Sequence, residues 1–321
     1  MPNTRLVAKA TVANHQPERW PPSELRNGTL WSIVRHIEKV DTMRLFALFA
    51  IAAGLCHAQR AEGSFDRTLS VTGFVDLDLT TDAGGIHVTP GPPGTVRIHG
   101  ILKAGDNWFT LGNVESRIRE LEAHPPIEQN GNSIRVAVRS RSLLRGISMR
   151  LEVEAPLDSR LRAHADSGGI DVRGIKGPVE CHTDSGGIHA SEIDGEVRAT
   201  ADSGGIHVRR VRGPVYARAD SGGIEALEIA GSVDAGADSG GVRVSQTTPA
   251  SIKARTDSGG AEITLARAGG YDIRAHAGSG GITAPNVTVS GTISRHDVNG
   301  RLRGGGPLVD VQADSGHIAI R

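Results

Sequence analysis

The stretch Asp202-Ser203-Gly204-Gly205-Ile206 decides the fold, because close copies of it recur along the chain at a nearly fixed spacing. Copies begin at Asp166, Asp184, Asp202, Asp220, Asp238 and Asp257, and degenerate copies begin at Gly278, Asp297 and Asp314. The first five copies, from Asp166 to Asp238, follow one another at equal intervals. A fixed period of about 20 residues is typical of a solenoid, in which each repeat forms one coil of a stack.

The repeat 202–219 predicts two short strands joined by turns. Ile206 and Val208 alternate with polar residues, which is the period of a half-buried strand. Gly213-Pro214 is a turn signal, and the segment 215–219 then alternates again. No helical period is present in the repeat, so each coil is expected to contain strands and turns alone.

Like residues recur at like positions of the repeat, which predicts inward-facing columns. The first column holds Ile170, Ile188, Ile206, Ile224, Val242, Ala261, Ile282 and Ile318, the second holds Val179, Val197, Val215, Val233, Ile252 and Ile273, and the third holds Cys181, Ala199, Ala217, Ala235, Ala254 and Ala275. Coils bury these apolar faces against one another, about 4.8 Å apart. The fold class is therefore all-β: a single-stranded β-helix, or β-solenoid, with coils of about 18 residues. Ile188 and Ile206 must then be neighbours.

The Asp-Ser-Gly-Gly segments predict tight corners. Asp and Ser side chains accept hydrogen bonds from nearby backbone N–H groups, and glycine permits a positive φ. The corner residues are Ser185, Gly186, Gly187, Ser203, Gly204, Gly205, Ser221, Gly222 and Gly223. An alternative is a calcium ladder formed by Asp166, Asp184, Asp202, Asp220, Asp238 and Asp257. The order of residues differs from the calcium-binding nonapeptide repeat, which favours the structural interpretation.

Two pairs of histidines are expected to stack on neighbouring coils. His189 and His207 occupy the same position of consecutive repeats, and so do His164 and His182. Each pair suggests a metal site, but the repeat offers no cysteine and no clear third ligand beside them. We therefore predict no metal and no cofactor. Gly-Asp-Ser-Gly-Gly also surrounds the nucleophile of chymotrypsin-type proteases, but a nucleophile is needed once and not at a structural period.

The N-terminal part differs from the repeats. Residues 1–42 show no repeat, whereas Met43 and Arg44 precede an apolar run over 45–55. Cys56 and Ala58 are small residues at positions −3 and −1 before Gln59, so the pattern predicts a secretory signal peptide over 43–58, cleaved after Ala58. The alternative is a buried helix or strand. We infer that Met43 is the true start, that 1–42 is a misassigned or disordered extension, and that the mature chain is secreted or periplasmic.

Residues 59–147 are expected to form atypical strands that cap the solenoid, which occupies 148–321. An insertion at 112–147 combines a helical pattern (Val114, Ile118, Leu121) with a turn signal at 129–132, typical of a hairpin. The chain ends in a strand-like run at 317–321 without an obvious cap. An uncovered strand edge pairs readily with another chain, so self-association through this C-terminal edge strand is expected.

Composition narrows the classes of partner. The formal net charge is zero, and the repeats carry no basic stripe, so nucleic-acid binding is not expected. The apolar run at 45–55 is too short to span a membrane, so the mature chain should have no membrane span. Aromatic residues make up 3% of the chain, which disfavours the sugar-stacking surfaces of carbohydrate-degrading β-helices.

The chain resembles the bacterial putative-adhesin family of unknown function, which is related to autotransporter-type adhesin heads. The resemblance covers 62–321 and depends on the signal-like start, the strand from Phe65 to Val71 and the Asp/Gly-Ser-Gly-Gly/Asp-Ile repeat. It implies a β-helix-like solenoid on the extracytoplasmic side of the membrane. The family supplies no catalytic residues, and this chain departs from it by its insertion at 112–147.

These observations predict a non-enzymatic, adhesin-like or scaffolding β-solenoid with no catalytic residues. Its expected partner is a protein or polysaccharide at the cell envelope. One alternative is a carbohydrate-active β-helix enzyme that resembles polysaccharide lyases, which would need a cluster of acids and bases that breaks the repeat. Another is a calcium-binding repeat module.

Overall fold

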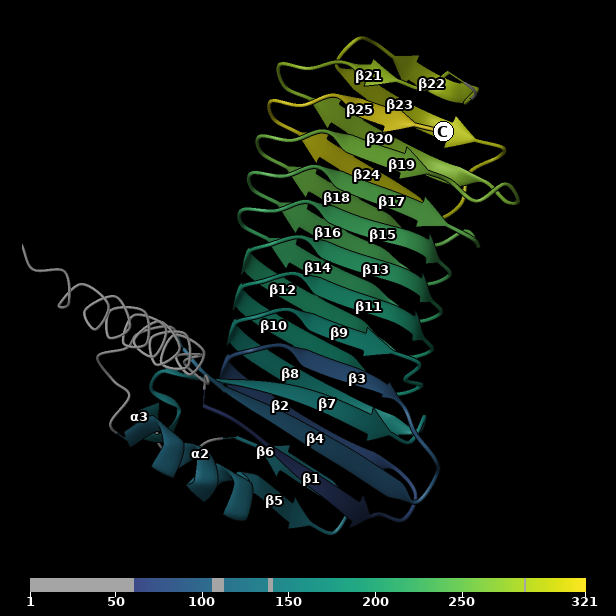
Figure 1. Ribbon diagram of the computed structural model, residues 1–321. Coiled ribbons are helices and arrows are strands. Elements are labelled where there is room, and N and C mark those ends of the chain that lie inside the picture. Colours follow the sequence, from purple (N-terminus) through teal and green to yellow (C-terminus); the bar gives the residue numbers. More distant parts are fainter. Residues whose placement is uncertain (1–60, 106–112, 138–140, 286) are drawn as a thin grey trace, which may run out of the picture. The chain divides into compact units, whose positions relative to one another are not determined.

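The computed structural model describes residues 61–105, 113–137, 141–285 and 287–321, all within one compact unit, Arg60–Arg321. This unit consists of two long sheets that face each other across a narrow core (Figure 1). Each regular coil gives one strand to each sheet and turns at the corners between them. The β-solenoid is therefore confirmed, as is the all-β class with a helix in its insertion.

Sheet A runs β1 (Glu62–Ser70), β4 (Thr95–Ala104), β7 (Ile147–Ala155), β3 (Ile86–Pro90), β9 (Ile170–Arg173), β11 (Ile188–Ile193), β13 (Ile206–Val211), β15 (Ile224–Ile229), β17 (Val242–Gln246), β19 (Ala261–Thr264), β25 (Ile318–Ile320) and β21 (Ile282–Thr283). Sheet B runs β22 (Val289–Ile293), β23 (Asp297–Leu302), β20 (Tyr271–Ala277), β24 (Leu308–Ala313), β18 (Ile252–Thr256), β16 (Val233–Ala237), β14 (Val215–Ala219), β12 (Val197–Ser203), β10 (Val179–Ser185), β8 (Ser159–Ser167), β2 (Val75–Ala83), β6 (Ser133–Val136) and β5 (Ile127–Asn130).

The expected inward columns are present in the regular coils. Ile188 pairs in register with Ile206 across the parallel strands β11 and β13, and both side chains are fully buried. Cys181 pairs with Ala199 in the small-residue column of sheet B. Burial raises the pKa of the Cys181 thiol to about 12, so this group is a small apolar filler of the core.

The corner glycines are needed because the coils approach closely, and not because of their φ angles. A Cβ on Gly204 would lie 2.0 Å from the carbonyl oxygen of Gly186, and a Cβ on Gly222 would lie equally close to the oxygen of Gly204. None of Gly186, Gly204 and Gly222 has a positive φ. The expectation of positive φ at these corners was therefore wrong: the hydrogen of glycine is required because no larger group fits under the preceding coil.

The N-terminal end of the stack is closed by antiparallel strands and a helix. Strand β4 pairs antiparallel with both β1 and β7, and β5 and β6 form the expected hairpin on sheet B. The expected helix is α2 (Val114–Ala123), which buries Val114, Ile118 and Leu121. Glu122, at its end, accepts a hydrogen bond of 2.9 Å from the backbone of Ser64 in β1. A short helix, α3 (Arg141–Leu144), precedes β7.

At the other end, the last coil in sequence is not the last coil in space. Strand β24 lies between β18 and β20, and β25 lies between β19 and β21. In the second inward column, Val309 therefore stands between Ile252 and Ile273, which the sequence had placed side by side. The predicted self-association through a C-terminal edge strand is wrong, because both backbone edges of β25 are already paired. The outermost strands at this end are β21 and β22.

Two expectations lie outside the described residues: the extension at 1–42 and the signal peptide at 43–58. Within the described part of the chain, no helix is both long and apolar enough to cross a membrane.

Candidate functional site

A groove follows the outer side of sheet A along a second column of glycines, each directly before the first inward residue of a strand. In one stretch, a trough of about 510 Å³ has Gly205, Gly223, Gly241 and Gly260 in its lining. In coils nearer the N-terminal end, a trough of about 410 Å³ has Gly85 and Gly169 in its lining. We call this surface the glycine groove. The groove exists because the residue at this position of successive coils is glycine, which has only a hydrogen where any other residue has a side chain.

One wall of the glycine groove is a ladder of polar side chains, one from each strand. In register, the wall is Glu152, His87, Asp171, His189, His207, Glu225, Arg243 and Glu262. Arg243 bridges two acids of this wall, at 2.7 Å from Glu225 and 3.1 Å from Glu262. The wall thus offers donors and acceptors of both signs at the spacing of the strands, about 4.8 Å.

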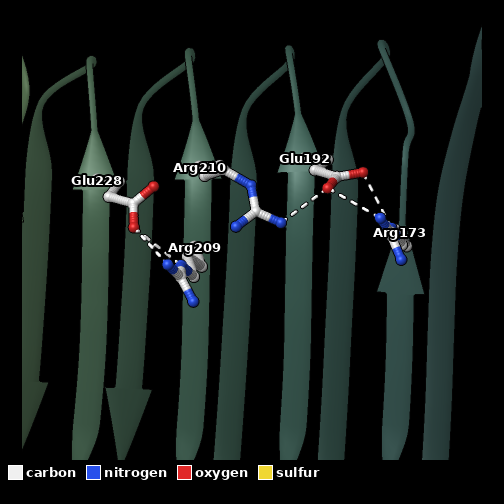
Figure 2. A network of polar contacts seen from close by, with 5 residues as sticks. All are labelled: Arg173, Glu192, Arg209, Arg210 and Glu228. Atoms are coloured by element: carbon white, nitrogen blue, oxygen red, sulfur yellow. Dashed lines mark hydrogen bonds and ion pairs between the residues drawn. The ribbon is translucent and has the colours of Figure 1, made fainter.

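Sheet A also carries a network of ion pairs where its strands end (Figure 2). The carboxylate of Glu192 lies between two guanidinium groups: Arg173 donates to it at 2.9 and 3.1 Å, and Arg210 donates at 2.7 Å. In the adjoining coils, Arg209 donates two hydrogen bonds to one oxygen of Glu228, at 2.9 and 2.7 Å. Hydrogen bonds from Arg173 and then from Arg210 lower the pKa of Glu192 to about 2.

The backbone at this network is unusual. Glu192, Arg210 and Glu228 all have a positive φ, between 53° and 59°, at the same position of successive coils. Gly174 holds this position in the preceding coil, with φ 68°. In an ordinary strand, consecutive side chains point to opposite faces. The left-handed backbone at Glu192 breaks this alternation, so Ser191 and Glu192 both lie at the surface and the next residue, Ile193, is buried. The left-handed backbone at this position is thus part of the coil geometry.

The predicted corner residues lie together on one edge of the stack, as expected, but their hydrogen bonds differ from those we predicted. Backbone groups of successive coils join the corners: the Ser221 N–H donates to the Asp202 oxygen at 2.9 Å, and the Ser239 N–H donates to the Asp220 oxygen at 3.0 Å. The expected bonds from Asp and Ser side chains to the local backbone are replaced by this ladder, which continues through Ser258.

The candidate calcium ligands Asp166, Asp184, Asp202, Asp220, Asp238 and Asp257 form one column along this edge. No three of these carboxylates offer oxygens within 4.8 Å of one another. Calcium takes six to eight oxygen ligands, so side chains of several coils would have to converge on an ion. Calcium binding at these residues stays an alternative hypothesis to the structural interpretation. Thermal unfolding with calcium and with a chelator tests it, because a ligand that binds only the folded state raises its stability.

Both expected histidine stacks are formed. The rings of His189 and His207 are parallel within 4° with centroids 4.8 Å apart, in the wall of the glycine groove. The rings of His164 and His182 stack in the same way on the outer face of sheet B.

Sequence reasoning missed the glycine groove. The signal was present in the second glycine of each corner, which was interpreted through backbone conformation alone. A glycine that recurs next to an inward residue also marks a line on the outer face where no side chain projects, and a line of such positions is a groove.

Residues 122–321 match the sequence profile of the family described as Toastrack DUF4097. No curated protein matches the chain. Among solved structures, the chain is similar to a "putative adhesin" from Bacteroides fragilis, with 15% identity and a TM-score of 0.38 over 80% of this chain and 97% of that one. It is also similar to a "putative cell adhesion protein" from Clostridium sporogenes, with 12% identity and a TM-score of 0.24 over 80% of this chain and 98% of that one.

Proposed function

The chain belongs to the Toastrack DUF4097 family, and from this premise we propose that it is a non-enzymatic, extracytoplasmic binding module of the adhesin or scaffold type. The glycine groove is its binding surface, and its partner is an extended polymer of the cell envelope, a protein segment or a polysaccharide chain. The observation that carries the proposal is the groove itself, which repeats one glycine and one polar wall residue in consecutive coils.

The shape of the groove favours an extended partner. A small ligand is usually enclosed in a pocket that buries most of its surface. The glycine groove consists instead of two open troughs, each of which crosses several neighbouring strands and has corner glycines in its lining. A polymer with its own regular repeat makes the same contact several times in such a groove, so weak single contacts add up.

The charges of the wall indicate a polar partner of mixed sign. Arg243 is shared by Glu225 and Glu262, and His207 lies 3.8 Å from Glu225, so acidic and basic groups lie next to one another in this part of the wall. A polyanion such as nucleic acid is recognised by a basic stripe, which this wall lacks. The periodic pairing of these acids with neighbouring bases also supports a binding surface rather than a catalytic acid–base pair.

The extracytoplasmic location is supported by the apolar segment at 43–58, which has the pattern of a cleaved signal peptide. Detection of a mature N-terminus at Gln59 in material from the producing cell tests this part of the proposal. A mature protein that retains 43–58 would contradict it.

Filling the groove tests the binding surface. A Cβ on Gly223 would meet its nearest atom, the Gly241 oxygen, at 3.4 Å, so the first carbon of a side chain makes an ordinary van der Waals contact here. Gly223→Trp should therefore fold normally and fill the floor of the groove. The matched control is Thr200→Trp, at an exposed position of β12 on sheet B.

Binding of each labelled variant to envelope preparations, separated into protein and polysaccharide fractions, is the measurement. We expect one fraction to retain the unmodified chain and the Thr200→Trp variant, and to lose the Gly223→Trp variant. Equal retention of both variants would exclude the groove. Turnover of an acidic polysaccharide would instead favour the lyase-like alternative.

A further inference from the structure

On the outer face of sheet B, two imidazoles and two carboxylates gather at neighbouring coils. The rings of His164 in β8 and His182 in β10 stack with centroids 4.9 Å apart and planes within 3°. Each histidine also contacts the acid two residues further along its strand: Nε2 of His164 lies 2.9 Å from Asp166, and Nε2 of His182 lies 3.2 Å from Asp184. The strand period makes this possible, because residues i and i+2 lie on the same face.

We propose that His164, His182 and Asp184 bind a divalent transition-metal ion, with zinc as the ion that fits this ligand set. Each offers one ligand atom, and these atoms all lie within 4.8 Å of one another. Imidazole nitrogen and carboxylate oxygen are ordinary zinc ligands, and three protein ligands leave a fourth position for water or for a group of a partner.

The side chains can close on an ion. Bond lengths of about 2.0–2.2 Å in a tetrahedral zinc site place the ligand atoms roughly 3.4 Å apart. His182 and Asp184 already lie 3.2 Å apart, and all three ligand atoms lie within 4.8 Å of one another, so movements of about 1 Å or less bring them to a common centre. Each is about 40–50% exposed and is free of the core, so rotation about its χ angles supplies this movement.

The register of the solenoid confines the site to these two coils. Along the same outward ladder, His164 is preceded by Thr80 and His182 is followed by Thr200, so this adjacent pair has no further imidazole next to it on either side. The column of corner acids continues beyond Asp184, but in the next coils Thr200 and Arg218 stand where the histidines stood. The combination His-x-Asp thus occurs in two adjacent coils, at 164–166 and 182–184.

The chain contains a matched internal control. His189 and His207 stack with the same geometry on sheet A, with centroids 4.8 Å apart. Their nearest ion-pair contact to an acid is longer, at 3.8 Å between His207 and Glu225. In the described residues, only the group of His164, His182 and Asp184 brings three such ligands within 4.8 Å. A stacked imidazole pair without a close third ligand should bind zinc much more weakly.

Calorimetric titration of the full chain with zinc, after treatment with a chelator, tests the proposal. Cobalt(II) in place of zinc reports tetrahedral coordination by its visible absorption. We expect one bound equivalent that depends on the cluster. His182→Asn and Asp184→Asn should each weaken binding at least tenfold and abolish the cobalt band, whereas His207→Asn should leave both unchanged. Circular dichroism without metal checks that every variant is folded.

The stability of the folded chain gives a second readout. Zinc should raise the Tm of the unmodified chain and of His207→Asn, and should not change the Tm of His182→Asn. The proposal is overturned if the unmodified chain binds no zinc, if His182→Asn binds as tightly as the unmodified chain, or if His207→Asn weakens binding as much as His182→Asn.

Discussion

Gly204 lies directly against the carbonyl oxygen of Gly186, so closely that a Cβ on Gly204 would come within 2.0 Å of that oxygen. The same contact repeats from coil to coil along the corner, and the atom in the way is always backbone, which cannot rotate aside. The coils can therefore stack at this spacing only if the residue at this position is glycine.

Gly204→Ala should destabilise the solenoid by about 1–3 kcal/mol, the usual cost of forcing an extra carbon into a packed site. The neighbouring variant Gly205→Ala is the control, because its Cβ would meet only the His207 ring at 3.2 Å and a backbone oxygen at 3.6 Å. It should change the stability by about 0.5 kcal/mol or less. Urea unfolding of both variants measures the difference, and equal losses would contradict the steric argument.

Arg210→Gly should be more stable than Arg210→Ala by about 1 kcal/mol, because Arg210 has a positive φ that glycine adopts freely. Both variants lose the ion pair with Glu192, so their difference isolates the backbone. At Arg209, in the extended part of β13, the order should reverse, with alanine more stable than glycine by about 0.5–1 kcal/mol. Thermal unfolding of the four variants measures these differences. If glycine and alanine ranked in the same order at both positions, the positive φ of Arg210 would not be the cause.

The ion pairs of Glu192 should make stability depend on pH in the acid range. The pKa of Glu192 is lowered from its ordinary value of 4.5 to about 2 in the folded chain. A lowered pKa means that the stabilisation is complete above about pH 4.5 and is lost as the pH falls through about 2. Nuclear magnetic resonance titration of the Glu192 carboxyl checks the value. Arg173→Met should raise this pKa toward 4.5, and an unchanged titration would show that Arg173 is not the cause.

Removal of residues 308–321 should disrupt the interior of the stack rather than trim its end. This segment forms β24 and β25, each paired on both sides, so its loss separates β18 from β20 and β19 from β21. We expect the amides of β20 and β23 to lose their protection in hydrogen exchange, together with the amides of β18 that face β24 in the complete chain. A shortened chain that keeps full protection over 271–302 would mean that β20 can pair directly with β18.

The regular coils followed from the sequence because their constant spacing fixes which residues meet. That spacing placed Ile188 beside Ile206 and Cys181 beside Ala199, and both pairs are found. The spatial order of the last coils could not be predicted, because the repeat pattern shows which residues point inward but not which coil lies next to which. Val309 and Ile273 both fit the second inward column, and the alternation of apolar residues is satisfied by either arrangement.

The two candidate sites were hidden for different reasons. The histidine pair was recognised at the sequence level, but no clear third ligand was identified beside it. Asp184 lies two residues from His182 on the same strand face, a relation that the recurring corner aspartates obscured. The glycine groove was not predicted because it results from the absence of side chains on the outer face. The repeat pattern was used to find the side chains that fill the interior.

The position of β24 and β25 has a consequence for synthesis of the protein on the ribosome. Residues 308–320 emerge after 271–302, yet they occupy the layer beneath them. When residues 271–302 emerge, the strand β24 with which β20 pairs has not yet been synthesised. Strand β20 therefore cannot reach its native pairing until the last residues of the chain are available. We therefore expect assembly of this end to be completed only when the last residues are available, unlike the stepwise growth that the regular coils allow.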